Sequence, residues 1–436
     1  MTRRTVPAII GVAALVVLGL IAYFLPSHRA QPAERSLKIY AIEIWSKDLN
    51  REFRAICEQW GRNNNVAVDV ELIPLQDADA KLSALVQTGG GADVAVFPAH
   101  KVPIYHRKLL DVTEIANELA KPFGGFYAIA RDMNAVDGRL YGMPLYAWSH
   151  IWVYNSALLG GNPLPRTFEE AEQLALTLKP LTQKGVYPFG IGLGKDDDAA
   201  MFLQAVLWAY GGSVVAEDGH TITIRSPEAH RAFEYVLRLY QVDKVIPPGA
   251  FGWDGASNNK NFLAQQIAFT MNSPTILVAA KADAPDLATN IQHARYPSGP
   301  AGQYSYATGF SIACLRTTSK EDLIFSFLRY LYTRDNYARL ISAGGGAVNP
   351  WLLGCEQLDI WNDPRMKVGL ESLAIERHVG YPGPVTAAAA EVFDKRVLAQ
   401  VINDVVNNSM TLDEALSHAY TAITSIYEQH RLMDNP

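Results

Sequence analysis

Cysteine is scarce in this sequence, and the few cysteines present lack the spacing of a metal site. The 436 residues include only Cys57, Cys314 and Cys355, with no C-x-x-C motif. Structural zinc is therefore not expected. Cys57 falls in an amphipathic helical pattern and is interpreted as a buried apolar residue. Cys314 and Cys355 could pair in an oxidising compartment, and the sequence leaves that pairing open.

The motifs of common enzymes are also missing. There is no G-x-S-x-G nucleophile elbow, and GIGLGK at 190–195 has neither phosphate-loop nor dinucleotide-binding spacing. Asp196, Asp197 and Asp198 lack EF-hand spacing and fit the start of a helix, although one of them could face a ligand. We predict no catalytic residue, no resident metal and no cofactor, and keep an enzyme as the alternative of a different class.

Positive charge is in deficit. Lys and Arg total 38 against 44 Asp and Glu, for a net charge of −6. A nucleic-acid-binding role is therefore not expected. Hydrophobic residues make up 49% and charged residues 19% of the chain, which excludes disorder. The length favours two lobes or domains.

One long apolar run lies at the start of the chain. Arg3 and Arg4 precede an uncharged stretch from residue 5 to residue 27. We interpret residues 1–33 as a signal peptide or an N-terminal membrane anchor, with membrane contact through residues 6–25 if they are not cleaved. Both alternatives place the protein in the periplasm, either soluble or tethered to the inner membrane.

After this segment the chain alternates between strand and helix patterns. Strands are predicted at 37–43, 66–72 and 92–97, and amphipathic helices at 49–60 and 78–87. This order is typical of an α/β domain with a largely parallel sheet. Later helix starts are predicted from three T-x-x-E capping boxes, which begin at Thr167, Thr318 and Thr411.

Aromatic and amide residues gather near the predicted strand ends, where ligands bind in open α/β sheets. Their flat faces and hydrogen-bonding groups suit sugar C–H surfaces and hydroxyls. On this basis the candidate ligand-binding residues are Trp45, His100, Trp148, Trp253, Asn272, Tyr306, Asn349 and Trp351.

Six segments, in order, resemble those of the large sugar-binding type of periplasmic solute-binding protein that serves ABC importers. They are ADVAVF at 92–97 with LLDV at 109–112, YGMP at 141–144 with YN at 154–155, PRTFEE at 165–170, FLAQQIAFTM at 262–271, GAVNP at 346–350 and TLDEAL at 411–416. The chain departs from the family pattern at Phe168, where tryptophan is usual, and at Gln265, where glycine is usual.

The resemblance implies a two-lobed α/β fold with an interlobe ligand cleft and hinge crossovers. The expected N-terminal lobe comprises residues 37–145 and 265–316, and the expected C-terminal lobe 146–264 and 317–436. By correspondence with the family, Trp148, Asp198, Asn272 and Thr275 are expected to contact the ligand. Thr275 stands where some sugar binders carry a stacking tryptophan, which argues against a closely maltose-like mode of binding.

The resemblance also implies the function. The expected protein is a monomeric substrate-binding receptor that captures a sugar or polyol by hinge closure and delivers it to ABC transporter permease subunits. One alternative is a receptor of the same fold for a metal ion, a polyamine or another polar solute; Tyr304 and Tyr306 would suit a metal but lack a clear partner set. Another is a membrane-tethered ligand sensor.

Overall fold

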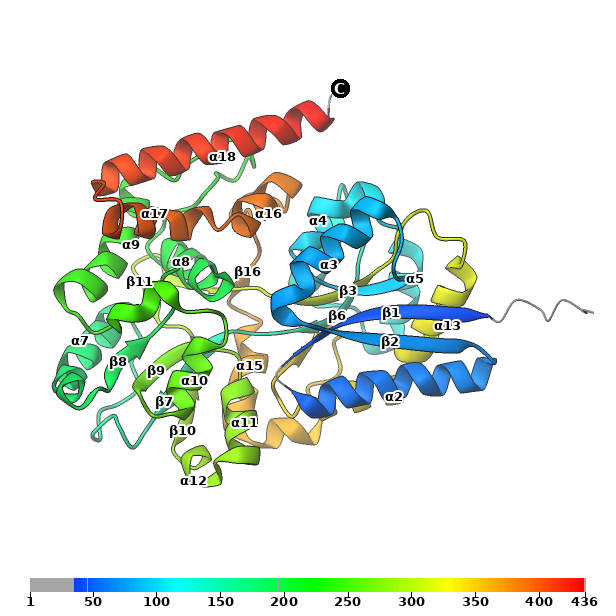
Figure 1. The fold of residues 1–436 in the computed structure, drawn as a ribbon, viewed down its shortest axis with the longest axis horizontal. Helices are drawn as coiled ribbons and strands as arrows, with labels where there is room; N and C mark the ends of the chain where they lie inside the picture. Colours follow the sequence, from blue (N-terminus) through cyan, green and yellow to red (C-terminus); the bar gives the residue numbers. More distant parts are fainter. Residues whose placement is uncertain (1–34, 45, 195, 435–436) are drawn as a thin grey trace, which may run out of the picture.

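Two β-sheets, each flanked by helices, form two lobes (Figure 1). The computed structural model describes residues 35–44, 46–194 and 196–434. The six-stranded sheet of the first lobe has the order β15-β6-β14-β3-β1-β2, and the four-stranded sheet of the second lobe has the order β10-β7-β9-β8. Each sheet mixes parallel and antiparallel pairs.

The first lobe begins with the strand–helix alternation expected from the sequence. Its strands are β1 (Ser36–Glu43), β2 (Ala67–Pro74), β3 (Val94–Pro98), β6 (Met143–Ala147), β14 (Gly309–Ala313) and β15 (Asn349–Pro350). Its main helices are α2 (Lys47–Asn64), α3 (Leu75–Thr88), α4 (Lys101–Tyr105), α5 (Thr113–Ala120), α6 (Ala128–Asn134), α13 (Glu321–Leu331) and α14 (Arg334–Ala343).

Helix α2 shows how the sequence specifies these elements. The Ser46 side chain caps its N-terminus by accepting a hydrogen bond from the Leu49 amide. Phe53 and Trp60 lie on its buried face, at helical spacing. The helix ends at Asn65, whose φ of 54° lies in the left-handed region that asparagine tolerates.

The second lobe has an aromatic core. Its strands are β7 (Ile151–Asn155), β8 (Tyr187–Gly190), β9 (Ile267–Asn272) and β10 (Ile291–Ala294). Its helices are α7 (Phe168–Leu178), α8 (Asp197–Ala209), α9 (Pro227–Leu237), α10 (Ser257–Leu263), α11 (Thr275–Asp283), α12 (Pro285–Ala288), α15 (Pro364–Ser372), α16 (Ala387–Asp394), α17 (Val397–Val406) and α18 (Leu412–Asp434). Trp152 stacks on Phe189 and Phe269, which anchors β7 to its sheet neighbours.

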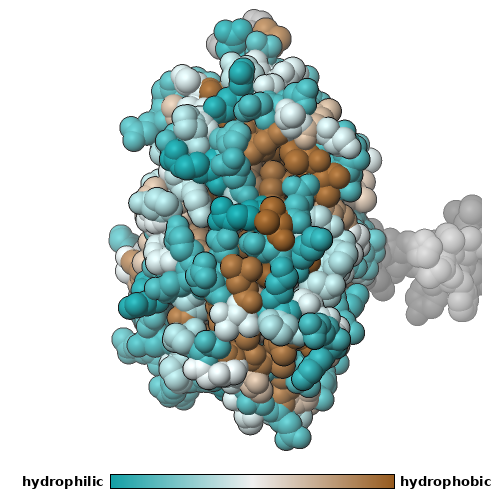
Figure 2. All heavy atoms as spheres, turned by 90° about the vertical axis from the view of Figure 1, so that its left-hand side faces the viewer, coloured by the Kyte–Doolittle hydropathy of each residue, from teal (hydrophilic) through white to brown (hydrophobic). Residues whose placement is uncertain are grey.

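Minor elements complete the chain. They are strands β4 (Ala135–Val136), β5 (Arg139–Leu140), β11 (Ser298–Gly299), β12 (Gly302–Gln303), β13 (Ser305–Tyr306) and β16 (Glu376–Arg377), together with short helical turns at His106–Lys108, Lys121–Phe123, Lys179–Lys184, Arg238–Val242, Pro248–Gly252 and Asp359–Asn362. The surface of the second lobe is mostly hydrophilic, with separate apolar patches (Figure 2).

Three segments connect the lobes. The first runs through Trp148 between β6 and β7, the second from β10 to β14 through β13, and the third from β15 of the first lobe to α16 of the second through β16. In the second and third segments β13 and β16 pair in parallel, with Ser305 opposite Glu376. Several crossovers that touch one another are the arrangement of a hinge, because a rotation of one lobe bends them together.

The expected lobe boundaries differ from the strand pairing. Strand β9 pairs with β7 and β8, and β10 pairs with β7, so residues 267–294 contribute to the second sheet and not to the first. Helices α13 and α14 pack against α2, so this part of 317–436 belongs to the first lobe. A strand that is buried on both faces, such as β9, carries no mark of its sheet, and its pairing partner decides where it lies.

The predicted helix starts have mixed outcomes. Thr167 and Thr411 accept backbone hydrogen bonds from Glu170 and Glu414, as predicted. The helix start predicted at Thr318 is wrong, because α13 begins at Glu321 and the Thr318 hydroxyl accepts a hydrogen bond from the Lys320 amide. Cys57, Cys314 and Cys355 are buried and free. In the part of the chain that the structure describes, no helix is both long and apolar enough to cross a membrane; residues 6–25 lie outside it.

Candidate functional site

Polar side chains at the end of β9 connect the two lobes. The Asn272 Oδ1 atom accepts hydrogen bonds from the Ser273 amide at 2.7 Å and from the Thr275 hydroxyl at 3.1 Å. The indole Nε1 of Trp148, in the first crossover, donates to the Ser273 hydroxyl. Three predicted ligand-binding residues, Trp148, Asn272 and Thr275, therefore lie together.

Two asparagines of α10 extend this group to Asp198. The Asn272 side-chain amide donates to Asn259 Oδ1, and Asn258 Nδ2 donates to Asp198 Oδ2 at 2.9 Å and to the Met271 carbonyl at 3.0 Å. Asn258 and Asn259 are both buried. We call the set formed by Trp148, Asp198, Asn258, Asn259, Asn272, Ser273 and Thr275 the amide network. Asn258, Asn259 and Ser273 were not predicted from the sequence, although the run SNNKN at 257–261 is rich in amides.

Two carboxyl groups at the start of α8, those of Asp196 and Asp198, have raised pKa values. Asp196 caps the helix by accepting from the Ala199 amide at 2.7 Å. Part of Asp198 is exposed, but its carboxyl is enclosed by protein, and this burial together with the neighbouring Asp196 and Asp197 raises its pKa well above the ordinary value. Burial also raises the pKa of Asp196 to about 6. A protonated carboxyl both donates and accepts hydrogen bonds, which suits an uncharged hydroxyl partner.

A column of rings joins the lobes beside the network. His100, from the first lobe, meets the Phe393 ring of α16 edge-on with ring centroids 4.9 Å apart. Phe393 stacks on Tyr306 at 4.5 Å, and Tyr306 stacks in turn on Trp208. The Tyr306 hydroxyl is buried and has no hydrogen-bond partner among the described residues. The predicted residues His100 and Tyr306 are thus linked through Phe393.

The other predicted residues are more scattered. Asn349 is fully buried in β15 opposite Ala147, and neither polar atom of its side-chain amide has a partner in the described part of the chain. Trp253 is partly buried and packs against the core of the first lobe. Trp351 is completely buried in that core, next to Gly309, so the structure does not bring it to the amide network. Trp45 lies outside the described residues.

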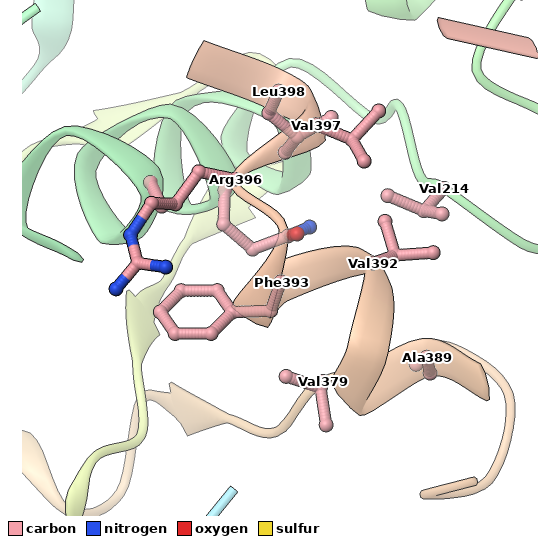
Figure 3. Close-up of a pocket in the computed structure, with 11 residues that line it drawn as sticks. Val214, Val379, Ala389, Val392, Phe393, Arg396, Val397 and Leu398 are labelled. Atoms are coloured by element: carbon pink, nitrogen blue, oxygen red, sulfur yellow. The ribbon is translucent and has the colours of Figure 1, made fainter. Parts of the chain in front are cut away.

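Two cavities near these residues differ in size. A pocket lined by Phe393, Val379 and Val392 holds only about 10 Å³, which is the space of one water molecule (Figure 3). A groove of about 1200 Å³ runs from the ends of β1 and β2 in the first lobe to α11, the helix that Thr275 begins. Ile44 and Ser46, which flank position 45, line it. Of these two cavities, the groove is the one with room for a metabolite-sized ligand.

The groups present define the chemistry of this region. They are amides, hydroxyls, indole and phenol rings, and carboxyls, which can form hydrogen bonds and stacking contacts with a polar molecule. Among the residues that the structure describes, no cluster of three His, Cys, Asp or Glu side chains could hold a metal ion.

Two α/β lobes joined by three crossovers, with polar side chains from both at their junction, define the class of two-lobed ligand-binding proteins. The chain belongs to the family of bacterial extracellular solute-binding proteins, whose sequence model matches residues 55–368. No curated protein matches the sequence.

Solved structures share the fold at low sequence identity. The maltose-bound MalE3 protein of T. maritima is 18% identical with a TM-score of 0.78, covering 90% of this chain and 99% of its own. An ABC transporter solute-binding protein from Thermotoga lettingae bound to α-D-tagatose is 18% identical with a TM-score of 0.79, covering 90% and 100%. One from Agrobacterium radiobacter in complex with ribitol is 16% identical with a TM-score of 0.75, covering 90% and 98%. The predicted two-lobed α/β fold is confirmed.

Proposed function

We propose that this protein is the substrate-binding receptor of an ABC importer and that it captures a sugar or a polyol between its lobes. The observation that carries the proposal is the amide network, which joins Trp148 of the first crossover to Asn272 and Asp198 of the second lobe. Membership of the extracellular solute-binding family supports the same role. The tagatose, maltose and ribitol complexes of similar fold support a small polyhydroxylated solute.

The mechanism needs no reaction on the solute. A solute that contacts both lobes stabilises the closed arrangement, because only there are all of its contacts made. An indole face covers C–H surface, and amides and carboxyls pair with hydroxyls. The closed receptor, a periplasmic monomer, then docks on the permease subunits. The N-terminal segment either is removed or tethers the receptor to the membrane.

A thermal-shift screen of the purified chain tests the proposal. The probes are maltose, α-D-tagatose, laminaribiose and ribitol, with spermidine and ferric citrate representing the other cargo classes. A ligand that binds only the native state stabilises it by about 2.7 kcal/mol at a hundredfold excess over Kd, and the melting temperature rises accordingly. A rise with one carbohydrate or polyol supports the proposal. A rise with spermidine or ferric ion alone overturns the assigned cargo, and release of a chemically altered carbohydrate overturns the receptor role.

A further inference from the structure

Two cations lie where the lobes meet. Lys101 begins α4, which follows β3 of the first lobe. Arg396 lies between α16 and α17 of the second lobe. Helices α4 and α16 pack against each other, and Figure 1 shows them next to one another in the upper part of the molecule, where the lobes meet.

Lys101 pairs with one acid from each lobe. Its Nζ atom lies 3.3 Å from Asp79 Oδ1 of α3 and forms a second ion pair with Asp394 of α16. The Lys101 side chain is only 4% exposed, so its charge depends on these partners and not on water. Burial by itself would lower the pKa of Lys101, but Asp394 and Asp79 raise it above the ordinary value and keep the ammonium charged.

Arg396 makes the complementary connection. Its guanidinium lies 2.7 Å from Asp197 Oδ1 at the start of α8 and 3.6 Å from Asp79 Oδ2 in the first lobe. Figure 3 shows this guanidinium directed away from the apolar side chains around Phe393. The Arg396 backbone has a φ of 54°, which lies in the left-handed region that is unfavourable for residues other than glycine. Strain of this kind persists only where surrounding contacts hold it in place.

Asp394 contacts three basic side chains. Besides Lys101, His100 Nε2 lies 3.7 Å away, and the Arg396 side chain donates to the Asp394 backbone carbonyl. Burial would raise the pKa of Asp394, yet the hydrogen bond from His100 and the charge of Lys101 hold it well below the ordinary range. We call the set formed by Asp79, Lys101, Asp197, Asp394 and Arg396 the cross-lobe clasp.

The clasp is built from contacts that an opening of the lobes would break. Asp79 and Lys101 belong to the first lobe, whereas Asp197, Asp394 and Arg396 belong to the second. Opening would separate Lys101 from Asp394 and Asp79 from Arg396, and would return each charge to water and its counterions. The amide network adjoins the clasp, because Asp197 and Asp198 are neighbours in the first turn of α8.

We propose that the cross-lobe clasp sets the equilibrium between open and closed lobes, and that its residues thereby act as positioning residues for solute capture. The apparent solute affinity scales with the fraction of molecules whose lobes can close. This step rests on the proposed function, but the effect on the lobes themselves can be measured without any solute.

The test measures the distance between the lobes by electron spin resonance. Spin labels are attached to the full chain at Gln87→Cys in α3 and Glu217→Cys in the second lobe, both exposed positions; the native cysteines are buried. Lys101→Met and Asp79→Asn each remove one partner of the clasp. The matched control is Arg329→Met, whose partner Glu118 lies in the same lobe at 2.8 Å.

Distances are recorded at about 0.05 M and about 1 M KCl, because salt weakens ion pairs. We expect the two clasp variants to shift the distribution to longer distances. The wild type should shift only part of the way toward them at high salt, because buried ion pairs are screened less than exposed ones. Arg329→Met should match the wild type at each salt concentration. Unchanged distances in both clasp variants, or an equal shift in the control, would overturn the proposal. Circular dichroism confirms that each variant is folded.

Affinity separates this proposal from the previous one. For the carbohydrate found in the thermal-shift screen, Lys101→Met should weaken binding about tenfold and reduce its salt dependence. If no carbohydrate binds but the distances change as expected, the clasp stands and the assigned cargo falls. If a carbohydrate binds and Lys101→Met leaves both distance and affinity unchanged, the clasp falls and the receptor stands.

Discussion

Two carboxyl groups at the junction of the lobes, the partly buried Asp394 and the buried Glu376, have pKa values shifted in opposite directions. Asp394 lies beside Lys101 and His100, which hold its pKa well below the ordinary value against the effect of burial. Glu376, in the third crossover, is 2% exposed, and burial raises its pKa to about 8. Burial alone therefore does not decide the charge of a carboxyl, because a neighbouring cation reverses its effect.

The surroundings of Glu376 explain the difference. Ser149 and Ser305, from the first and second crossovers, are fully buried beside it, and no cation contributes to its titration. Burial keeps the nearby His150 uncharged by lowering its pKa to about 3. The hinge thus holds a carboxyl that is stable as a neutral acid, whereas the clasp holds one that is stable as an anion.

The largest expected effect comes from raising the pH. The folded protein binds the Glu376 proton more tightly than the unfolded chain, so the free energy of unfolding should fall as the pH rises from about 4.5 through about 8. Over this window the loss is at most about 5 kcal/mol, at about 1.4 kcal/mol per pKa unit. Urea unfolding at several pH values measures it. Glu376→Gln should remove this part of the pH dependence, while Glu217→Gln, at an exposed position, should retain it. If the unfolding free energy of Glu376→Gln falls with pH as steeply as that of the wild type, Glu376 is not the source of this pH dependence.

Removing the Asp394 carboxyl should change the pH dependence of the unfolding free energy in the opposite direction. The stabilisation from Asp394 is present above its ordinary pKa of 3.8 and is lost as the pH falls toward its lowered value. Asp394→Asn should cost about 2 kcal/mol of unfolding free energy at neutral pH, and the difference from wild type should shrink in acid. Asp69→Asn, at an exposed acid 3.8 Å from Lys38, is the control and should change little. A constant difference at all pH values would show that the charge of Asp394 is not the cause.

The amide network supplies a third case, in which polar groups meet without an ion pair. Trp148→Ala removes the indole that donates to Ser273 and should weaken carbohydrate binding at least about tenfold, equally at low and high salt. Isothermal titration with the carbohydrate found in the screen measures the Kd. Trp253→Ala, outside the network, is the matched control. An unchanged Kd for Trp148→Ala would remove this residue from the site.

The smallest effect is expected for an ion pair within one lobe. Arg329 and Glu118 form a bidentate ion pair, in which each of two guanidinium nitrogens lies 2.8 Å from a carboxylate oxygen, and both side chains are about half exposed. Water and salt screen such pairs, so Arg329→Met should change the unfolding free energy by about 0.5 kcal/mol or less. Thermal melts compare it with Lys101→Met. If the two variants lose the same unfolding free energy, the ion pairs between the lobes stabilise the protein no more than an ion pair within one lobe.

Much of the first lobe could be predicted because its signals are local. Strands β1 to β3 and helices α2 and α3 follow from alternation and helical spacing, with Ser46 and Asn65 at the ends of α2. The placement of β9 could not be predicted, because a strand whose six residues are all buried fits either sheet. Thr318 carried a capping signal that the chain does not use, since Lys320 occupies the cap position.

The site divides in the same way. The aromatic and amide character of Trp148, Asn272 and Thr275 could be recognised along the sequence, and the structure joins these residues by hydrogen bonds. Trp351 carried the same signal but packs in a core, because an indole buries as readily as it binds a ligand. Asn258 and Asn259 escaped notice because nothing local marks which amide of a polar run will be buried.

The sequence by itself determined the alternation of elements in the first lobe, some helix starts and the family, since these depend on neighbouring residues and on motif order. Only the tertiary structure decided the charges at the junction. Lys101 meets Asp394 across 293 positions of the chain, whereas the Glu376 carboxyl lies beside serines and, among the described residues, has no ion pair with a cation. Charge states in a low-dielectric interior depend on which groups the fold brings within a few ångströms, and that proximity is not encoded in any single segment.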